Sequence, residues 1–319
     1  LDINNINLGF QLDGKFTEVV RGVDLCVAPH EIIGILGESG SGKSVTVKSI
    51  FRINEEEIII QGGEILFRDQ EITKMSEKEM TNLRFKKIAY IPQNPSDALN
   101  PYQTIKKQFL ELSKIHRIKI SLDKIARALS DVGIENPETI MKMYAYQLSG
   151  GLAQRVVFAM SIILEPPLII ADEPTSAIDA SLKKIILDLL KKINHEKGIS
   201  IIVITHDFDV IKYLANRIYV MYGGLILEEG KIDDVINNPL HPYTVELIKC
   251  VESIENNEER FYSMEGTPES PIDFSNTCPF LNRCSEKNSL CEIKIPKLVE
   301  FNGHLVRCVK YIKESDANE

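Results

Sequence analysis

Residues 37–44 read Gly37-Glu38-Ser39-Gly40-Ser41-Gly42-Lys43-Ser44 and fit the pattern G-x-x-x-x-G-K-[ST]. A short apolar, β-branched run at 32–36 precedes this stretch, and a segment that can form a helix, 44–50, follows it. The combination predicts a tight turn between a buried parallel strand and a helix. In such a turn the glycines let successive backbone N–H groups point toward a β-phosphate, and the positive end of the helix faces the same anion.

This stretch therefore predicts a site for a nucleoside triphosphate. Lys43 would bridge β- and γ-phosphate oxygens and take part in catalysis, and the Ser44 hydroxyl would ligate Mg²⁺. The alternative is a glycine-rich turn that matches the pattern by chance, which the motifs downstream argue against. The residues expected at the nucleotide are Gly37, Ser39, Gly40, Ser41, Gly42, Lys43, Ser44 and Val45.

Composition limits the class of protein. A chain of 319 residues with 44% hydrophobic content is long enough for one large domain with an appendage, or for two domains. Its longest apolar stretch, 156–164, is too short to cross a bilayer, and residues 1–4 do not begin a secretory signal, so synthesis in the cytosol is expected. The net charge of −9 argues against a nucleic-acid partner, because phosphate backbones are bound by basic surfaces.

The chain before the glycine-rich turn alternates in hydrophobicity over residues 1–30, which predicts an antiparallel β region. Phe16 could stack on the adenine of a bound nucleotide. Phe10 is the competing candidate, and either ring could instead belong to the core. Residues 58–68 predict a strand with a turn.

A second strand is predicted at 88–91, where a β-branched run stops at Pro92 and leaves Gln93 at its exit. Gln93 could reach the metal and the attacking water, or it could be a surface glutamine in a turn. From about 96 to 164 the pattern is helical, which predicts a helical insert in an α/β core.

Within this insert, Ser149, Gly150 and Gly151 open an apolar helix, and such an N-terminus can bind an anion. If this helix lies on a separate lobe, its N-terminus reaches a nucleotide held by a second molecule more easily than one held by the same chain. A simple serine N-cap would explain Ser149 but not the paired glycines.

Two adjacent acids, Asp172 and Glu173, end an apolar strand that begins at residue 168. Asp172 would hold Mg²⁺, directly or through water, and Glu173 would polarise the water that attacks the γ-phosphate. The last parallel strand, 200–205, ends at His206, which could contact the γ-phosphate. Three other histidines are expected at the surface: His30, His116 and His195.

In this order the motifs resemble those of the ATP-binding-cassette (ABC) family. The set consists of Gly37–Ser44, Gln93, Leu148–Gly151, Asp172-Glu173, Ser176–Asp179 and His206, and the resemblance covers about residues 1–235. It implies an α/β fold with a RecA-like core, an antiparallel β region and a helical subdomain at about 96–164.

The resemblance also implies roles for individual residues. Gln93 would couple hydrolysis to a membrane subunit, Ser149 and Gly151 would bind the γ-phosphate in trans, and Asp179 would help the two halves communicate. Two positions depart from the family pattern, since His30 replaces a usual glycine and Leu152 a usual glutamine.

Residues 238–244 and a cysteine-rich tail resemble the ATPase subunits of oligopeptide, dipeptide and nickel importers. We therefore expect a cassette at 1–240 and a C-terminal module of the oligopeptide-permease type at 241–319. Cys26 and Cys250 are isolated and are expected to be buried. The other four cysteines are Cys278, Cys284, Cys291 and Cys308.

The spacing of these four cysteines contains no C-x₂₋₄-C knuckle, which argues against structural zinc, and irregularly spaced thiolates suit an iron-sulfur cluster. The importer tails that this one resembles carry a four-iron four-sulfur cluster. His304 is a possible substitute ligand.

The function expected from the resemblance is that of the ATP-hydrolysing, energy-coupling subunit of a peptide importer, with ATP and Mg²⁺. It would lie on the cytoplasmic face of the membrane with a homologous second ATPase, two permease subunits and, indirectly, an extracytoplasmic solute-binding protein. A nickel importer is the alternative. A soluble ABC ATPase acting on nucleic acid or ribosomes is less favoured, because there is one cassette, no heptad run and an acidic composition.

Overall fold

The computed structural model describes residues 1–12, 14–53, 58–176, 178, 180–255 and 262–312. The chain divides into two compact units. The first comprises Leu1–Cys26, Ile33–Lys74 and Thr205–Glu319, and the second comprises Val27–Ile32 and Met75–Ile204. The expected boundary at residue 240 remains a prediction.

The first unit contains the antiparallel β region that the sequence predicts. Its sheet has the strand order β2-β1-β4-β5, with bounds Asp2–Leu12 (β1), Lys15–Cys26 (β2), Ile59–Phe67 (β4) and Gln70–Glu71 (β5). The turn expected within residues 58–68 was wrong, because β4 continues through that region as one strand. Gly63, with φ of +82°, lies against the Asn4 and Asn5 carbonyls, where the β1–β4 register shifts, so it accommodates a bulge.

A second set of strands in this unit has the order β11-β12-β10-β9-β3. The bounds are Ile32–Leu36 (β3), Arg217–Tyr222 (β9), Leu225–Lys231 (β10), Val299–Phe301 (β11) and His304–Val306 (β12). β3 pairs with β9 in parallel and is buried at all five positions, as its apolar run predicts. The other pairs in this set are antiparallel, so the C-terminal strands β11 and β12 extend the sheet beyond β10. The helices of this unit are Lys43–Phe51 (α1), Phe208–Leu214 (α8), Ile232–Asn237 (α9) and Pro242–Glu255 (α10).

The second unit contains three parallel strands in the order β8-β7-β6. Their bounds are Ile88–Ile91 (β6), Leu168–Asp172 (β7) and Ser200–Thr205 (β8), and β7 and β8 are buried throughout. The helices are Glu77–Leu83 (α2), Ile105–His116 (α3), Leu122–Asp131 (α4), Pro137–Lys142 (α5), Gly150–Ile162 (α6) and Ala180–Lys197 (α7).

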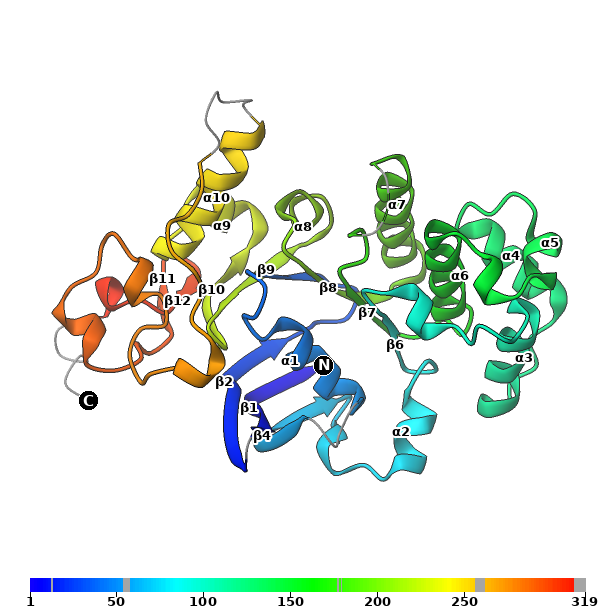
Figure 1. The fold of residues 1–319 in the computed structure, drawn as a ribbon, viewed down its shortest axis with the longest axis horizontal. Coiled ribbons are helices and arrows are strands. Elements are labelled where there is room, and N and C mark those ends of the chain that lie inside the picture. The colour runs from blue at the N-terminus through cyan, green and yellow to red at the C-terminus, as the bar shows by residue number, and fades with distance from the viewer. Residues whose placement is uncertain (13, 54–57, 177, 179, 256–261, 313–319) are drawn as a thin grey trace. The chain divides into compact units, whose positions relative to one another are not determined.

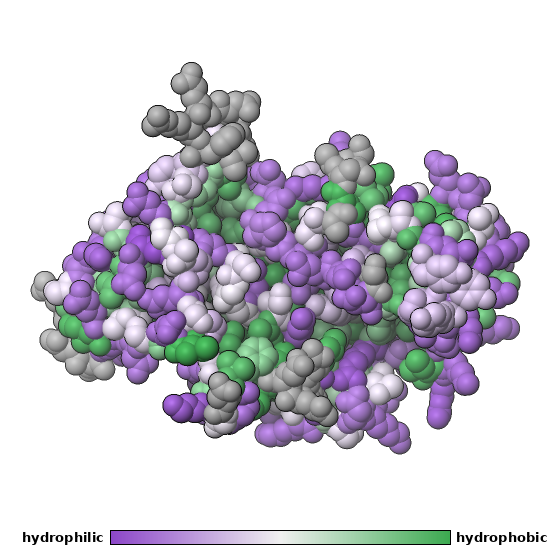
Figure 2. All heavy atoms as spheres, viewed as in Figure 1, coloured by the Kyte–Doolittle hydropathy of each residue, from purple (hydrophilic) through white to green (hydrophobic). Residues whose placement is uncertain are grey.

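The helices α3, α4, α5 and α6 all fall within the helical insert expected at about 96–164, and they lie together in Figure 1. The bounds of the insert remain a prediction. Local signals set its helix starts. The Ser121 Oγ accepts the Lys124 N–H at 3.2 Å ahead of α4, and Pro137 occupies the first turn of α5, where its missing N–H costs nothing. Hydrophilic side chains cover most of the face that Figure 2 shows for this insert.

Two expectations about burial were wrong. His116 is only 8% exposed, because it ends α3 on the buried face that Phe109 and Leu112 also occupy. This burial lowers the pKa of His116, and the nearby positive charge of Lys86 lowers it further. Cys26 is exposed, because it follows the buried Leu25 in the alternation of β2 and so faces outward.

Within the part of the chain that the structure describes, every helix is too short or too polar to span a lipid bilayer.

Candidate nucleotide site

The glycine-rich turn of the first unit joins the buried strand β3 to helix α1. Gly42 is the N-cap of α1, with φ of +101°, which only glycine adopts without strain. A Cβ atom on Gly42 would lie 2.8 Å from the Met221 methyl group, and one on Gly37 would lie 2.1 Å from the Met221 carbonyl oxygen. The turn therefore leaves no room for side chains at these two positions, and its backbone can approach a ligand closely.

Lys43 lies inside this turn and is 7% exposed. Its Nζ donates to the carbonyl oxygens of Gly37 at 2.7 Å and Glu38 at 2.8 Å, and to the Ser41 Oγ at 3.3 Å. A buried ammonium at the N-terminus of a nine-residue helix attracts anions. With Ser44 half-buried in the first turn of α1, the donor set fits a triphosphate with its Mg²⁺.

Phe16, Phe10 and His206 belong to the same unit. The Phe16 ring is half-buried and lies across Gly9, where an added Cβ would be 2.6 Å from its Cζ. Phe10 is also half-buried, so the choice of an adenine-stacking ring stays a prediction. His206 is exposed directly after β8, and Asp207 follows it as the N-cap of α8 by accepting the N–H groups of Asp209 and Val210.

The two acids of the second unit end strand β7. Asp172 is 1% exposed, and the Tyr90 hydroxyl donates to its Oδ2 at 2.9 Å. Burial raises the pKa of Tyr90, and the negative charge of Asp172 raises it further, so the phenol remains a hydrogen-bond donor. Asp172 is thus oriented by a partner that cannot compete with it for a cation.

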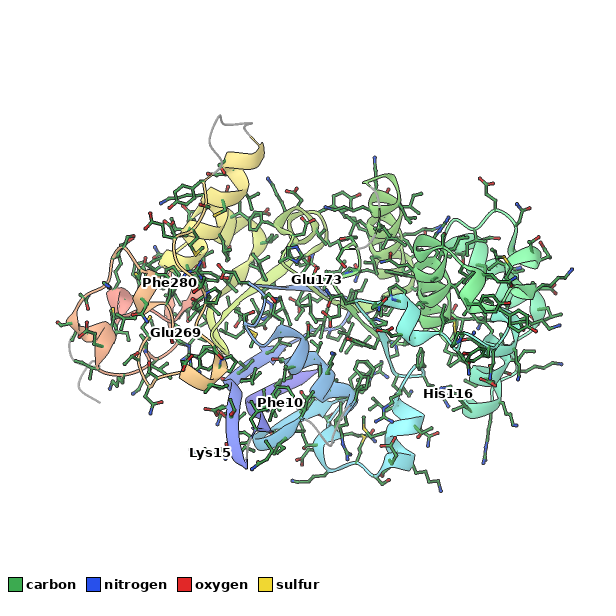
Figure 3. The ribbon with its side chains drawn as sticks, viewed as in Figure 1. Phe10, Lys15, His116, Glu173, Glu269 and Phe280 are labelled. Atoms are coloured by element: carbon green, nitrogen blue, oxygen red, sulfur yellow. The ribbon has the colours of Figure 1, made fainter. Side chains whose placement is uncertain are left out.

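Glu173, labelled in Figure 3, is 9% exposed and has φ of +48°, a conformation that is uncommon for residues other than glycine. Its N–H donates to the Ile204 carbonyl at 2.8 Å, and its own carbonyl accepts the N–H and Oγ of Ser176 at 3.3 and 3.1 Å. These bonds hold the backbone in the strained conformation, as is common where function demands a fixed side chain.

The glycine pair at 150–151 opens the 13-residue helix α6. The Ser149 Oγ accepts the Leu152 N–H at 3.4 Å, so Ser149 is an N-cap, and Gly150 has open space on its Cβ side. Buried Gln154 on the same helix donates from Nε2 to the Pro174 carbonyl, immediately after Glu173. Helix α6 and the end of β7 are therefore held together within this unit.

The remaining expected residues are placed as follows. Gln93 is exposed in a bend between β6 and the 3₁₀ turn Pro95–Ala98. Asp179 lies outside the described residues. Gly37–Val45, Phe16 and His206 belong to the first unit, and Gln93, Ser149–Gly151 and Asp172-Glu173 to the second.

The four cysteines of the tail line a single cavity of about 250 Å³ in the first unit. They are Cys278, Cys284, Cys291 and Cys308, and all are free thiols. Burial raises the pKa of the Cys278 thiol to about 12, and the proximity of the other three adds to the rise. In the described ranges, no three metal-ligating side chains are close enough to hold a single metal ion.

Three residues near these sites were not predicted. Tyr90 was expected only as part of a strand, yet its hydroxyl reaches Asp172. Tyr243 and Arg283 reach Glu38 of the glycine-rich turn from 205 and 245 residues further along the chain. Neither periodicity nor a motif links such distant positions.

Comparison with known proteins agrees with this geometry. Residues 20–176 match the profile described as "ABC transporter", and residues 227–291 match "Oligopeptide/dipeptide transporter, C-terminal region". The chain is 36% identical to the dipeptide transport ATP-binding protein of Bacillus subtilis (strain 168) over 97% of its own length and 93% of that protein. It is 33% identical to the oligopeptide transport ATP-binding protein of Salmonella typhimurium, over 98% and 94%.

Among solved structures, a dimeric ATP-binding cassette in a post-hydrolysis state, bound to ADP and Pi, superposes with a TM-score of 0.65. The two chains are 28% identical, and the match covers 72% of this chain and 98% of the other. The protein belongs to the ABC transporter family and carries its ATP-hydrolysing cassette. Within that family it has the C-terminal region of the oligopeptide and dipeptide transporters.

Proposed function

We propose that this chain is the energy-coupling ATPase of a membrane importer for peptides. The observation that carries the proposal is the phosphate-binding turn with its buried Lys43, in a chain that aligns over nearly its full length with peptide-transport ATP-binding proteins. Both relatives named above are described as transport ATP-binding proteins for peptides, which supports a peptide substrate over nickel.

Each site residue has a proposed role. Lys43 binds β- and γ-phosphate oxygens, together with the N–H groups of the turn, and the Ser44 hydroxyl, Gln93 and Asp172 would hold Mg²⁺. When bound, the metal ion neutralises charge on the phosphates. Tyr90 orients Asp172.

Catalysis by these residues is positional and electrostatic. Glu173 accepts a proton from the attacking water, and its fixed backbone aims the carboxylate. His206 contacts the γ-phosphate, and Phe16 stacks on the adenine.

The signature residues Ser149, Gly150 and Gly151 are proposed to bind the γ-phosphate held by a second, homologous ATPase subunit. The dimeric state of the cassette to which this fold is similar supports this arrangement. Two permease subunits would hold the pair at the cytoplasmic face of the membrane, with a solute-binding protein acting on the outer side. Asp179 would link the two ATPase subunits.

The nucleotide assignment is tested by Lys43→Ala. This substitution removes the lysine of the phosphate-binding turn. A buried triphosphate would then lose its main compensating cation, so tight binding of ATP should disappear. Calorimetric titration with Mg·ATP measures this, with Lys48→Ala on the following turn of α1 as the matched control. Equal affinity in wild type and Lys43→Ala would refute the assignment.

The peptide assignment is tested by reconstituting the chain with its cognate permeases and partner ATPase in vesicles. ATP hydrolysis should rise when the binding protein is loaded with a di- or oligopeptide. A rise with Ni²⁺ and none with peptides would overturn this part of the proposal.

For the tail, we propose that the cysteine cavity holds a four-iron four-sulfur cluster. Four free thiols facing one cavity of about 250 Å³ fit such a group, which spreads its ligands more widely than a single ion does. The thiols must lose their protons on loading. Burial raises the pKa of Cys278, Cys284 and Cys308, so loading should release protons.

Protein purified without oxygen should then be brown, absorb near ~400 nm and contain iron and labile sulfide. Zinc without iron or sulfide would refute the cluster.

A further inference from the structure

Glu38, the second residue of the phosphate-binding turn, is held at three of its atoms. Its carbonyl oxygen accepts from the Lys43 Nζ at 2.8 Å. Its N–H donates to the Tyr243 hydroxyl at 3.0 Å, and its carboxylate accepts from the Arg283 Nη1 at 2.8 Å. The first partner belongs to the turn itself, whereas the other two come from the C-terminal region.

The Arg283–Glu38 pair is largely shielded from water. The Arg283 side chain is 6% exposed and that of Glu38 is 25% exposed. Arg283 also donates to the Tyr222 hydroxyl at 3.2 Å and, from Nε, to the Glu265 carbonyl at 3.0 Å, so its guanidinium has a fixed orientation. Burial by itself would lower the pKa of Arg283, but the hydrogen bonds to Glu38 and Tyr222 raise it overall.

Tyr243 belongs to an aromatic cluster that also packs near Arg283. Phe280, labelled in Figure 3, is 1% exposed and packs against Tyr222 and Tyr243 at ring-centroid distances of 5.4 and 5.3 Å. The Tyr222 and Tyr243 rings are 4.6 Å apart. Phe280 lies two residues after Cys278, and Arg283 lies one residue before Cys284, so the cluster is continuous with the wall of the cysteine cavity.

We propose that Arg283 and Tyr243 are positioning residues for the phosphate-binding turn, so that the C-terminal region sets how tightly the cassette binds nucleotide. The inference rests on the proposed nucleotide function. In this proposal Arg283 and Tyr243 touch no phosphate. Tyr243 holds the N–H of Glu38 and Arg283 holds its carboxylate, and the Glu38 carbonyl in turn accepts from Lys43.

The experiment measures the dissociation constant for Mg·ADP by calorimetry in the full chain, because ADP reports on the turn without hydrolysis. Arg283→Met removes the charge and keeps the aliphatic stem. Loss of a charge-assisted hydrogen bond to a partly exposed carboxylate should weaken ADP binding roughly tenfold. Tyr243→Phe removes only the hydroxyl and should weaken it roughly threefold, as expected for a neutral hydrogen bond. Lys249→Met, a surface cation paired with Glu246 on α10, is the matched control and should bind ADP like wild type.

A double-mutant cycle separates positioning from a general loss of folding. Glu38→Gln should weaken binding about as much as Arg283→Met, and the double variant should be no weaker than either single one. Thermal unfolding of each variant is recorded in parallel. Lower thermal midpoints with an unchanged dissociation constant for Mg·ADP would mean that the contact is merely structural and would overturn the inference. It would also be overturned if the two substitutions weakened ADP binding independently, so that their fold-changes multiplied in the double variant. Failure of the wild-type chain to bind ADP would instead contradict the proposed function.

Discussion

The backbone of Glu173 lies in the left-handed region, and the residue is only 9% exposed directly after β7. Glu173→Gln keeps the size and conformation of the side chain but removes its ability to accept a proton. We expect nucleotide binding to persist and hydrolysis in the assembled transporter to fall by roughly 10²–10⁴. Steady-state ATPase assays measure this, with Glu196→Gln on α7 as a control that should hydrolyse ATP normally. Wild-type turnover by Glu173→Gln would assign the base elsewhere.

His30 occupies a position where φ is +64°, a conformation that glycine adopts more readily than other residues. Its N–H donates to the Ser200 Oγ at 2.9 Å, its carbonyl accepts from the Asn194 Nδ2 at 2.9 Å, and its ring lies against Gly198. These contacts hold the histidine in this conformation.

This contact predicts a coupled pair of substitutions. Gly198→Ala should lower stability by more than the about 1–2 kcal/mol that a side chain at a φ of +63° costs, because the new Cβ would also lie 2.2 Å from the His30 ring. In a His30→Gly background the steric part of that loss should vanish while the backbone part remains. Differential scanning calorimetry of the four proteins tests this, and strictly additive shifts in melting temperature would contradict it.

Helix α6 starts with a serine that could act as a cap, as an anion contact, or as both. Ser149→Ala loses both roles and should lower stability by about 1 kcal/mol, whereas Ser149→Asn retains the cap. If the proposed role in trans holds, both variants should hydrolyse ATP slowly with the partner subunit, although Ser149→Asn unfolds like wild type. Ser121→Ala and Ser121→Asn at the cap of α4 are the matched controls. Wild-type ATP hydrolysis by Ser149→Asn would mean that Ser149 only caps the helix and has no role in trans.

Elements with a strong local signal could be predicted from the sequence. β3, β7 and β8 are buried at every position, so their residues form continuous apolar runs that end in polar groups. β4 was missed as a single strand, because Gly62-Gly63 resembles a turn in sequence and accommodates a bulge in the sheet. A glycine pair signals an unusual backbone without specifying which kind.

Candidate site residues could be chosen from the sequence where a polar residue follows a strand end, but contacts that depend on long-range packing could not. The positions of Lys43 and Asp172 follow from their motifs, whereas the contacts of Glu38 with Tyr243 and Arg283 depend on the fold of the tail. The prediction that His116 lies at the surface was wrong, because the local sequence does not show whether a histidine on such a helix points inward or outward. Tertiary contacts, and not local sequence, determine the environments of these residues.

At the scale of the molecule, one substitution can test how far nucleotide binding by the cassette depends on the folding of the tail. Cys284→Ser removes a proposed cluster ligand and should remove the brown colour and speed proteolysis after about residue 265, because a small segment loses the group that folds it. Nucleotide should still bind, but about as weakly as to Arg283→Met. Cys250→Ser, at an isolated half-buried thiol, is the control. Complete loss of ADP binding would mean that the tail is integral to the cassette.

The pairing of β12 with β10 has a further consequence for handling the protein. Glu228 and Glu229 of β10 pair with Val306 and Leu305 of β12, and Leu227 accepts the N–H of Arg307. A chain cut before residue 262 would leave this side of β10 as an open edge with unpaired N–H and C=O groups beside the buried Leu227. Such an edge recruits strands from other molecules, so we expect the shortened protein to self-associate and precipitate, as light scattering would detect. In the intact protein β12 covers this edge, and we expect it to protect the cassette against aggregation.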